Sequence, residues 1–236
     1  LEGCEFRDNA AVHGAAARFD RGAATISNST FVDNETFTGG GAAVQGWESS
    51  SVNVSQCQFI RNRGGGLYLH DGTHQIEDSQ FLENLGPSIT VDWLAEADIN
   101  RCSFVRNIGL GACGLSNDGY ARVRNCAFIG NLAEGSGAAI ANGGALTGIN
   151  CAFLGNRAGG FVFYPLHVPQ AGFAGAVDNA GGAAFLNCTF VGNHAGHIGG
   201  VWGGSAVGLT NCILWGNSDD YSGFGELAQV NTYQEN

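Results

Sequence analysis

Apolar and polar positions alternate along this chain in a unit that recurs nine times. The unit reads Cys/Ser-x-Phe-x-x-Asn, with Leu in place of Phe in the last copy, and an apolar residue precedes eight copies by three places. Its copies begin at Cys4, Ser29, Cys57, Ser79, Cys102, Cys126, Cys151, Cys188 and Cys212. Positions two apart share one face of a strand, so the pattern predicts a strand and not a helix, which needs apolar residues three and four apart.

Each repeat is too short to bury its own apolar face. A second apolar segment follows each Asn after a Gly-rich corner, as at residues 66–69, 88–91 and 160–163. Stacking the units at the ~4.8 Å strand spacing would bury Phe on Phe in a continuous core, with right-handed crossovers. We therefore predict an all-β fold, a right-handed single-stranded parallel β-helix (solenoid) of about nine rungs.

The spacing also predicts how the chain is divided. The β-helix should span residues 1–217, and one gap of 37 residues between copies predicts an inserted loop near 164–181. Residues 218–236 should form a partial rung or a C-terminal cap. Residues 1–4 fall inside the first copy, so we expect this chain to be part of a longer polypeptide.

An Asn closes every copy of the motif. Its amide can bond both to turn backbone groups and to the same residue one rung above. We interpret the set as a buried structural stack, formed by Asn9, Asn34, Asn62, Asn84, Asn107, Asn131, Asn156, Asn193 and Asn217.

Seven of the eight cysteines fall on one column, where Ser replaces Cys in two copies. A position that accepts either residue is a small interior site, so we expect buried free thiols, with disulfides between neighbouring rungs as the alternative. No spacing typical of a zinc site is present.

Charge excludes two classes of partner. The chain has no Lys, ten Arg and 21 acidic residues, for a net charge of −11. Nucleic acids and anionic membranes need a basic surface, so we expect neither as a partner. No apolar run reaches the roughly 20 residues of a membrane span.

The repeated Phe-x-x-Asn, together with Gly-rich segments at 40–44, 65–67, 137–140 and 199–201, resembles the polymorphic outer membrane protein repeat. It is also similar to the wider group of pectate-lyase-like bacterial surface β-helix proteins. The resemblance covers nearly the whole chain and implies an extracellular or cell-surface location, often with adhesion. It implies the fold more than the activity, because this fold hosts adhesins, lyases, hydrolases and scaffolds.

The turn between the two strands of each rung varies most and gathers Trp, Tyr, His and Asp side chains. Aromatic faces beside carboxylates suit neutral sugar rings. Alternatively, these residues are only structural: Asp-Gly and Asn-Gly favour tight turns, and the aromatic rings pack against the ends of the loops. The candidate ligand-binding residues are Trp47, His70, Asp71, His74, Trp93, Asp118, Tyr120, Tyr164, His167 and Trp202.

Two classes of function remain open. The first is an extracellular or cell-surface adhesin or scaffold whose partners are neutral glycans or host and surface proteins. The second is a carbohydrate-active enzyme, a glycosidase or polysaccharide lyase. The missing Lys and the acidic charge argue against a polyuronate lyase, whereas a two-carboxylate glycosidase would use Asp71, Asp92 or Asp118. We assign no catalytic residue, and we expect no cofactor except calcium at these same turn carboxylates, although no calcium-loop spacing is visible.

Overall fold

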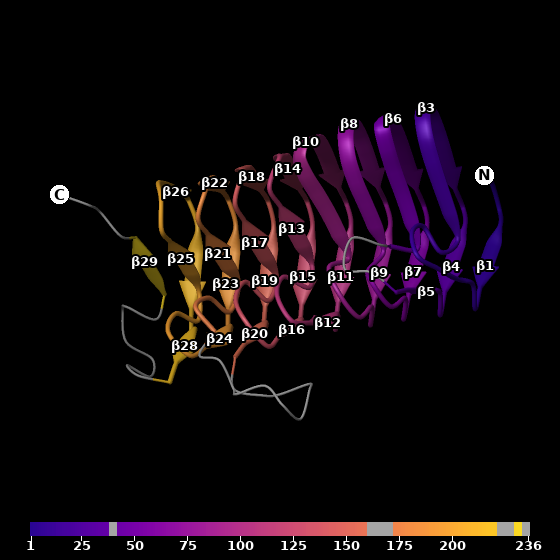
Figure 1. The fold of residues 1–236 in the computed structure, drawn as a ribbon. Coiled ribbons are helices and arrows are strands. Elements are labelled where there is room, and N and C mark those ends of the chain that lie inside the picture. Colours follow the sequence, from indigo (N-terminus) through magenta and orange to yellow (C-terminus); the bar gives the residue numbers. More distant parts are fainter. Residues whose placement is uncertain (38–41, 160–171, 221–228, 233–236) are drawn as a thin grey trace.

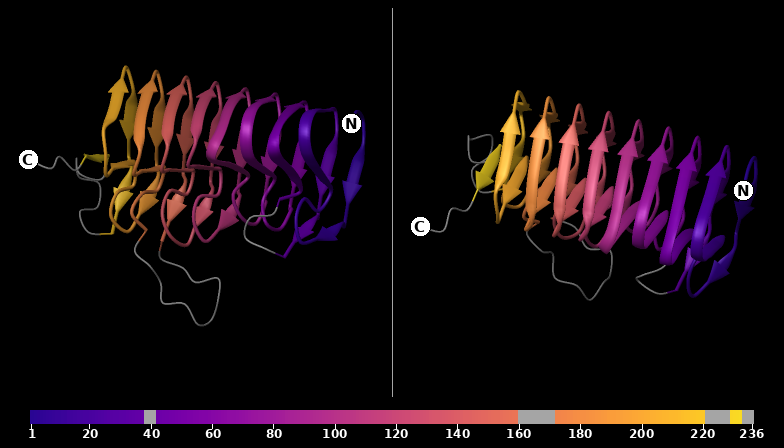
Figure 2. Two further views of the ribbon diagram at one scale, coloured as in Figure 1. Left: turned by 45° about the horizontal axis from the view of Figure 1, so that its top comes forward. Right: turned by 90° about the horizontal axis from the view of Figure 1, so that it is seen from above.

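The computed structural model describes residues 1–37, 42–159, 172–220 and 229–232. These residues form strands and turns, without a helix, and the strands stack in parallel along a rod, as predicted (Figure 1). The rungs follow one another in chain order from the N-terminal to the C-terminal end in both further views (Figure 2).

The repeated motif forms a nine-stranded parallel sheet. Its strands, one in each of rungs one to nine, are β1 (Glu5–Arg7), β4 (Thr30–Val32), β7 (Gln58–Ile60), β9 (Gln80–Leu82), β11 (Ser103–Val105), β15 (Ala127–Ile129), β19 (Ala152–Leu154), β23 (Thr189–Val191) and β27 (Ile213–Trp215). Every Phe is in register with the Phe of the next rung, and Phe190 is in register with Leu214.

A thirteen-stranded sheet closes the other side of each rung. It begins with four long strands, β3 (Ala17–Ser27), β6 (Val44–Ser55), β8 (Leu67–Glu77) and β10 (Ile89–Asn100). The later rungs replace each long strand by two short ones, and β10 pairs with both members of the first such pair. These short strands are β13 (Leu115–Asn117), β14 (Tyr120–Arg124), β17 (Ile140–Asn142), β18 (Ala145–Ile149), β21 (Val177–Asn179), β22 (Gly182–Leu186), β25 (Val201–Gly203), β26 (Val207–Thr210) and β29 (Val230–Thr232).

Two narrow sheets lie between the larger ones. One joins β2 (Ala10–Ala11) and β5 (Glu35–Thr36). The other contains β12 (Ile108–Gly109), β16 (Leu132–Ala133), β20 (Arg157–Ala158), β24 (His194–Ala195) and β28 (Ser218–Asp219).

Stacked rings fill the core. Seven successive Phe pairs, from Phe6 to Phe190, have ring centroids 4.5–5.0 Å apart and planes within 6° of parallel. Phe59, Phe81 and Phe104 are fully buried. Each such ring contributes about 1.5–3 kcal/mol by removal of apolar surface from water.

The motif Asn residues form a continuous ladder. In each step the Nδ2 of one Asn donates to the Oδ1 of the next at 2.9–3.0 Å. The same amide also donates to the carbonyl of the Phe in the preceding rung, and its Oδ1 accepts the backbone N–H of the preceding Asn. Gln229 closes the ladder by accepting from Asn217 Nδ2 at 2.7 Å. The ladder leaves no amide group of its interior members unpaired.

Left-handed backbone turns form both corners of the nine-stranded sheet. The residues that precede the Cys/Ser and the closing Asn have φ between 49° and 63° in all nine rungs. Their side chains point outward and pair across rungs in the N-terminal half, as for Arg61 with Asp33 at 2.8 Å and Arg101 with Asp78 at 2.6 Å. Hydrogen bonding to Arg61 lowers the pKa of Asp33 below its ordinary value.

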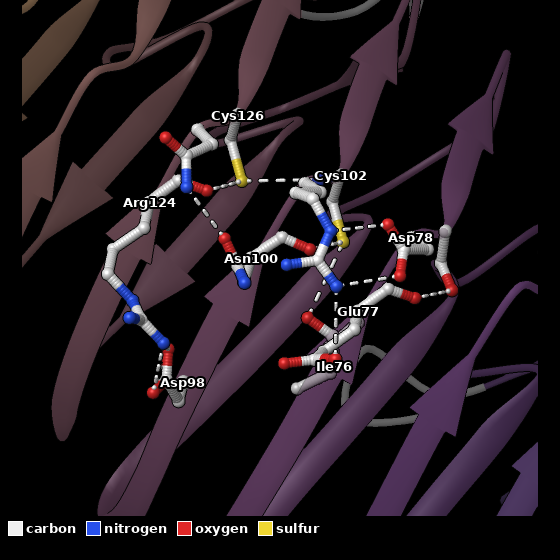
Figure 3. Close-up of polar contacts among 11 residues, drawn as sticks. Ile76, Glu77, Asp78, Asp98, Asn100, Cys102, Arg124 and Cys126 are labelled. Carbon is white, nitrogen blue, oxygen red and sulfur yellow. Dashed lines mark hydrogen bonds and ion pairs between the residues drawn. The ribbon is translucent and has the colours of Figure 1, made fainter.

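All eight cysteines are free thiols, and six of them are buried. In the motif column the sulfur takes the place of a Ser hydroxyl. Cys126 Sγ accepts the backbone N–H of Cys102 at 3.4 Å (Figure 3). Ser79 Oγ accepts that of Cys57 at 3.1 Å in the same way.

Parts of the expected insertion and C-terminal segment are described. Residues 164–171 lie outside the described residues, and β21 lies within the remainder of the expected loop, paired with β17. After residue 217, β28 pairs with β24, and β29 pairs with β25.

Candidate functional site

The outer side of the first long strands carries polar and aromatic side chains. In β8, two buried leucines alternate with Tyr68 and His70, which therefore point away from the core. In β6, Gly46 is in register with the inward Leu69, so the next residue, Trp47, points outward like His70. Asp92 of β10 follows the buried Val91 and also points outward. Side chains that lie far apart in sequence thus meet on three adjacent rungs.

Trp47 is the centre of this group. Its ring centroid lies 3.8 Å from that of His70 and 6.2 Å from that of Tyr68. On the other side the Arg18 guanidinium lies 5.4 Å from the Trp47 ring centroid and pairs with Asp20 at 2.7 Å. The indole is therefore held between rings and a cation, and it remains half-buried.

Two carboxylates border the rings. Tyr68 Oη donates to Asp92 Oδ2 at 2.8 Å. His70 lies between the carboxylates, with Nδ1 3.7 Å from Asp71 Oδ1 and Nε2 3.9 Å from Asp92 Oδ2. Both distances exceed a direct hydrogen bond, and His70 Nδ1 is buried without a hydrogen-bond partner. We call Trp47, Tyr68, His70, Asp71 and Asp92 the aromatic–carboxylate cluster.

Tyr68 stays a neutral donor at ordinary pH. Burial, together with the hydrogen bond to Asp92 and its charge, raises the pKa of Tyr68 to about 12. The Tyr68 hydroxyl therefore donates to Asp92 Oδ2, while Asp92 Oδ1 accepts the backbone N–H of Trp93 at 2.9 Å. Each carboxylate oxygen has a further lone pair that can accept a hydrogen bond.

His74 lies beneath the cluster and not in it. Its side chain is fully buried, Nδ1 accepts the N–H of Val52 at 3.1 Å, and Nε2 lies 2.8 Å from the Asp71 carbonyl oxygen. Nε2 must carry the proton, because a carbonyl oxygen can only accept. Burial lowers the pKa of His74, so this neutral ring fixes the turn that presents the Asp71 side chain.

A family model described as a right-handed β-helix region matches residues 1–128, just over half of the chain. The chain belongs to the right-handed β-helix family. This match confirms the predicted hand of the crossovers and the resemblance to β-helix repeat proteins.

Other comparisons add little to this assignment. No curated protein matches the chain. Among solved structures, HetL, a pentapeptide repeat protein involved in heterocyst differentiation regulation in the cyanobacterium Nostoc, has 10% sequence identity and a TM-score of 0.25. The alignment covers 90% of this chain and 86% of HetL.

The other described candidate residues border the cluster or lie farther along the rod. Trp93 is 68% exposed on β10 and donates its backbone N–H to Asp92 Oδ1 at 2.9 Å. Asp118 and Tyr120 are exposed on the next rung, and the charge of Asp118 also raises the pKa of Tyr68. Trp202 lies on β25, five rungs along the rod from β8 and thus about 24 Å away by the strand spacing. It forms a second group with Phe173. Tyr164 and His167 lie outside the described residues.

The structure therefore brings together Trp47, His70 and Asp71 of the predicted set, with Asp92, which the sequence indicated only as a catalytic or calcium-binding carboxylate. Tyr68 and Arg18 were missed by sequence reasoning. A signal for Tyr68 was present, because it alternates with two leucines on a predicted strand.

Two absences apply to the described part of the β-helix. Residues 1–37, 42–159, 172–220 and 229–232 contain no group of three or more His, Cys, Asp or Glu side chains arranged to hold a metal ion. Over the same ranges, no helix has the length and apolar character needed to cross a membrane.

Proposed function

We propose that this β-helix is an extracellular or cell-surface adhesin or scaffold module that binds neutral glycans at the aromatic–carboxylate cluster. One observation carries the proposal: the indole of Trp47 is fixed beside His70 at 3.8 Å, next to a Tyr68–Asp92 hydrogen bond of 2.8 Å. The cluster thus has an apolar ring surface with acceptors at its border.

This arrangement matches the chemistry of a sugar. A pyranose offers an apolar face of C–H groups, which packs on an aromatic ring, and hydroxyl donors around its edge. The carboxylates of Asp71 and Asp92 supply acceptors for those hydroxyls. Because the rings are held before binding, little side-chain entropy is lost on association.

Charge selects neutral over acidic sugars. The chain carries a net charge of −11, and Asp20, Asp71 and Asp92 all lie near Trp47 or His70. The one cation described beside the indole, Arg18, is already paired with Asp20. An acidic polysaccharide would meet three carboxylates and one cation, which is unfavourable.

Affinity electrophoresis through gels containing neutral glucans, mannans or galactans tests the proposal. We expect retardation of the wild-type protein by at least one of them and loss of about tenfold in affinity in Trp47→Ala, equivalent to ~1.4 kcal/mol. Trp202→Ala is the matched control, because Trp202 is a partly exposed indole of the same sheet, on β25, outside the aromatic–carboxylate cluster.

Equal retardation of wild type and Trp47→Ala, or no retardation in any gel, would contradict the proposal. The same mixtures should be assayed for new reducing ends and unsaturated products. A glycan that is retained without being consumed supports a binding module, whereas cleavage would favour a carbohydrate-active enzyme.

A further inference from the structure

The outer face of the nine-stranded sheet carries an apolar stripe. In each rung the residue after the motif Phe, or after Leu214 in the last rung, points outward, and from rung two to rung nine it is always apolar. The stripe consists of Val32, Ile60, Leu82, Val105, Ile129, Leu154, Val191 and Trp215, which are in register along the sheet. Val32 is buried, whereas Ile129 is 39% exposed, Trp215 is 74% exposed, and the other five residues are partly exposed.

The residues beside the stripe divide the face into two halves. At the corner that precedes the closing Asn, rungs two to five carry the charged residues Asp33, Arg61, Glu83 and Arg106, whereas rungs six to nine carry Gly130, Gly155, Gly192 and Gly216. At the opposite corner, rungs four and five carry Asp78 and Arg101. Rungs six to nine carry the hydrogen-bonded amides Asn125, Asn150, Asn187 and Asn211.

The outward residue before the motif Phe changes in polarity between the halves. It is Thr30, Gln58, Gln80 and Ser103 in rungs two to five, all polar. In rungs six to nine it is Ala127, Ala152, Thr189 and Ile213, of which only Thr189 is polar. One half of the face is therefore charged and polar beside the stripe, and the other is uncharged and mostly apolar.

We propose that two copies of this chain associate antiparallel through this face, about a two-fold axis that runs along the strands between β11 and β15. This axis lays the stripe upon itself, because it preserves the position along each strand while reversing the order of the rungs. A two-fold axis along the rod would instead place each rung on the same rung of the partner, so that the charged half would face the charged half.

The antiparallel arrangement matches the two halves. Rung two then faces rung nine and rung five faces rung six, so each charged corner residue faces a Gly or an Asn. The larger Gln80 faces Ala152, and Leu82 faces Leu154. No like charges meet, although each copy carries a net charge of −11.

The area is that of a stable dimer. Eight rungs at ~4.8 Å and six residues of strand and corner at ~3.3 Å give about 760 Å² on each copy. A standard interface buries roughly 800 Å² on each partner.

Analytical ultracentrifugation tests the dimer. We expect the wild type to be dimeric at about 50 µM, since interfaces of this size have Kd values from micromolar to picomolar. Leu154→Glu and Leu82→Arg should each be folded by circular dichroism and monomeric, with Kd raised by at least about 100-fold, because each places an unpaired charge in the interface. Thr147→Glu adds the same charge on the outer side of β18 and should leave the dimer unchanged.

Mixing the two monomeric variants tests the register. In the antiparallel dimer the changed side chains face each other once, as an ion pair, and the second contact keeps both leucines. We therefore expect the equimolar mixture to dimerise within about tenfold of the wild-type Kd. A monomeric wild type, dimeric single variants, or a mixture that stays monomeric would each overturn the proposal.

Discussion

Removing one central amide of the Asn ladder should destabilise the whole rod. Asn107 is fully buried; its Oδ1 accepts the N–H and the Nδ2 of Asn84, both at 3.0 Å. Its Nδ2 donates to the Phe81 carbonyl at 3.1 Å and to Asn131 Oδ1 at 2.9 Å. In Asn107→Ala the Asn84 N–H and the Phe81 carbonyl both lose this side-chain partner in the core, whereas Asn131 Oδ1 keeps the Asn107 N–H.

The expected loss is large compared with the stability of a typical domain. At roughly 1–3 kcal/mol for each buried polar group left without a partner, Asn107→Ala should lose about 4 kcal/mol of unfolding free energy. Native proteins have only about 5–15 kcal/mol. Because each rung contacts only its neighbours, the transition should also broaden as the two halves of the rod uncouple.

Equilibrium unfolding in guanidinium chloride measures this effect, and Asn9→Ala is its control. Asn9 occupies the exposed start of the ladder and donates to Asn34 Oδ1 at 2.9 Å without accepting from a preceding rung. Asn9→Ala should therefore lower the free energy of unfolding by less than about 1 kcal/mol. If both variants unfold at the same midpoint, the ladder does not stabilise the fold through its buried amides.

Three further predictions follow from particular positions. Gly114→Ala should strongly destabilise the fold in thermal unfolding, because a Cβ there would lie 2.4 Å from a backbone oxygen of the next rung, whereas Gly182→Ala, with nothing within 4 Å, should be neutral. Thiol–thiol contacts and burial raise the pKa of Cys126 and Cys151 to about 12, so mass spectrometry should find neither alkylated by iodoacetamide at about pH 8 until the protein unfolds. Burial lowers the pKa of His74 below 6.5, so the unfolded chain binds that proton more tightly and stability should fall as the pH drops below about 6.5; His74→Gln should flatten this part of the pH dependence of the unfolding midpoint.

The interior of the rod was predictable because identical side chains mark it. Cys or Ser, Phe and Asn recur at fixed positions, and stacking strands in register places each residue on its own copy. A second buried amide ladder was missed, in which Asn117 donates to Asn142 and Asn142 to Asn179, both at 2.6 Å. It has only three members and belongs to the short second strand, where the surrounding sequence varies.

The corners show a limit of a different kind. Their left-handed φ values are uniform, but the residues include Gly, Asn, Asp, Glu, Gln and Arg. The turn requires a positive φ of the main chain and does not require a particular side chain. The outward side chain therefore varies from rung to rung, and no single residue type marks the turn.

The aromatic–carboxylate cluster was predictable only in part, for the same reason. Trp47, His70 and Asp71 stood out as chemistry-bearing residues in variable turns. Their contacts depend on how the long strands β6, β8 and β10 place outward side chains on adjacent rungs, with register shifts between β6 and β8 and between β8 and β10. Such shifts have no repeated sequence signal, so the contacts of Tyr68 and Arg18 with Trp47 could be found only in the structure.

A stacked interior leaves the outer faces free to differ. The cluster lies on the thirteen-stranded sheet and the apolar stripe on the nine-stranded sheet, so a change in one does not touch the other. Far-separated sites with no shared partners act additively. The Leu154→Glu monomer should therefore bind a short neutral glycan as tightly as the wild type. It should bind a glycan-coated surface more weakly, because the wild-type dimer carries two clusters, and binding of the first raises the effective concentration of the second at the surface. If the monomer lost affinity for the short glycan as well, the two faces would not be independent.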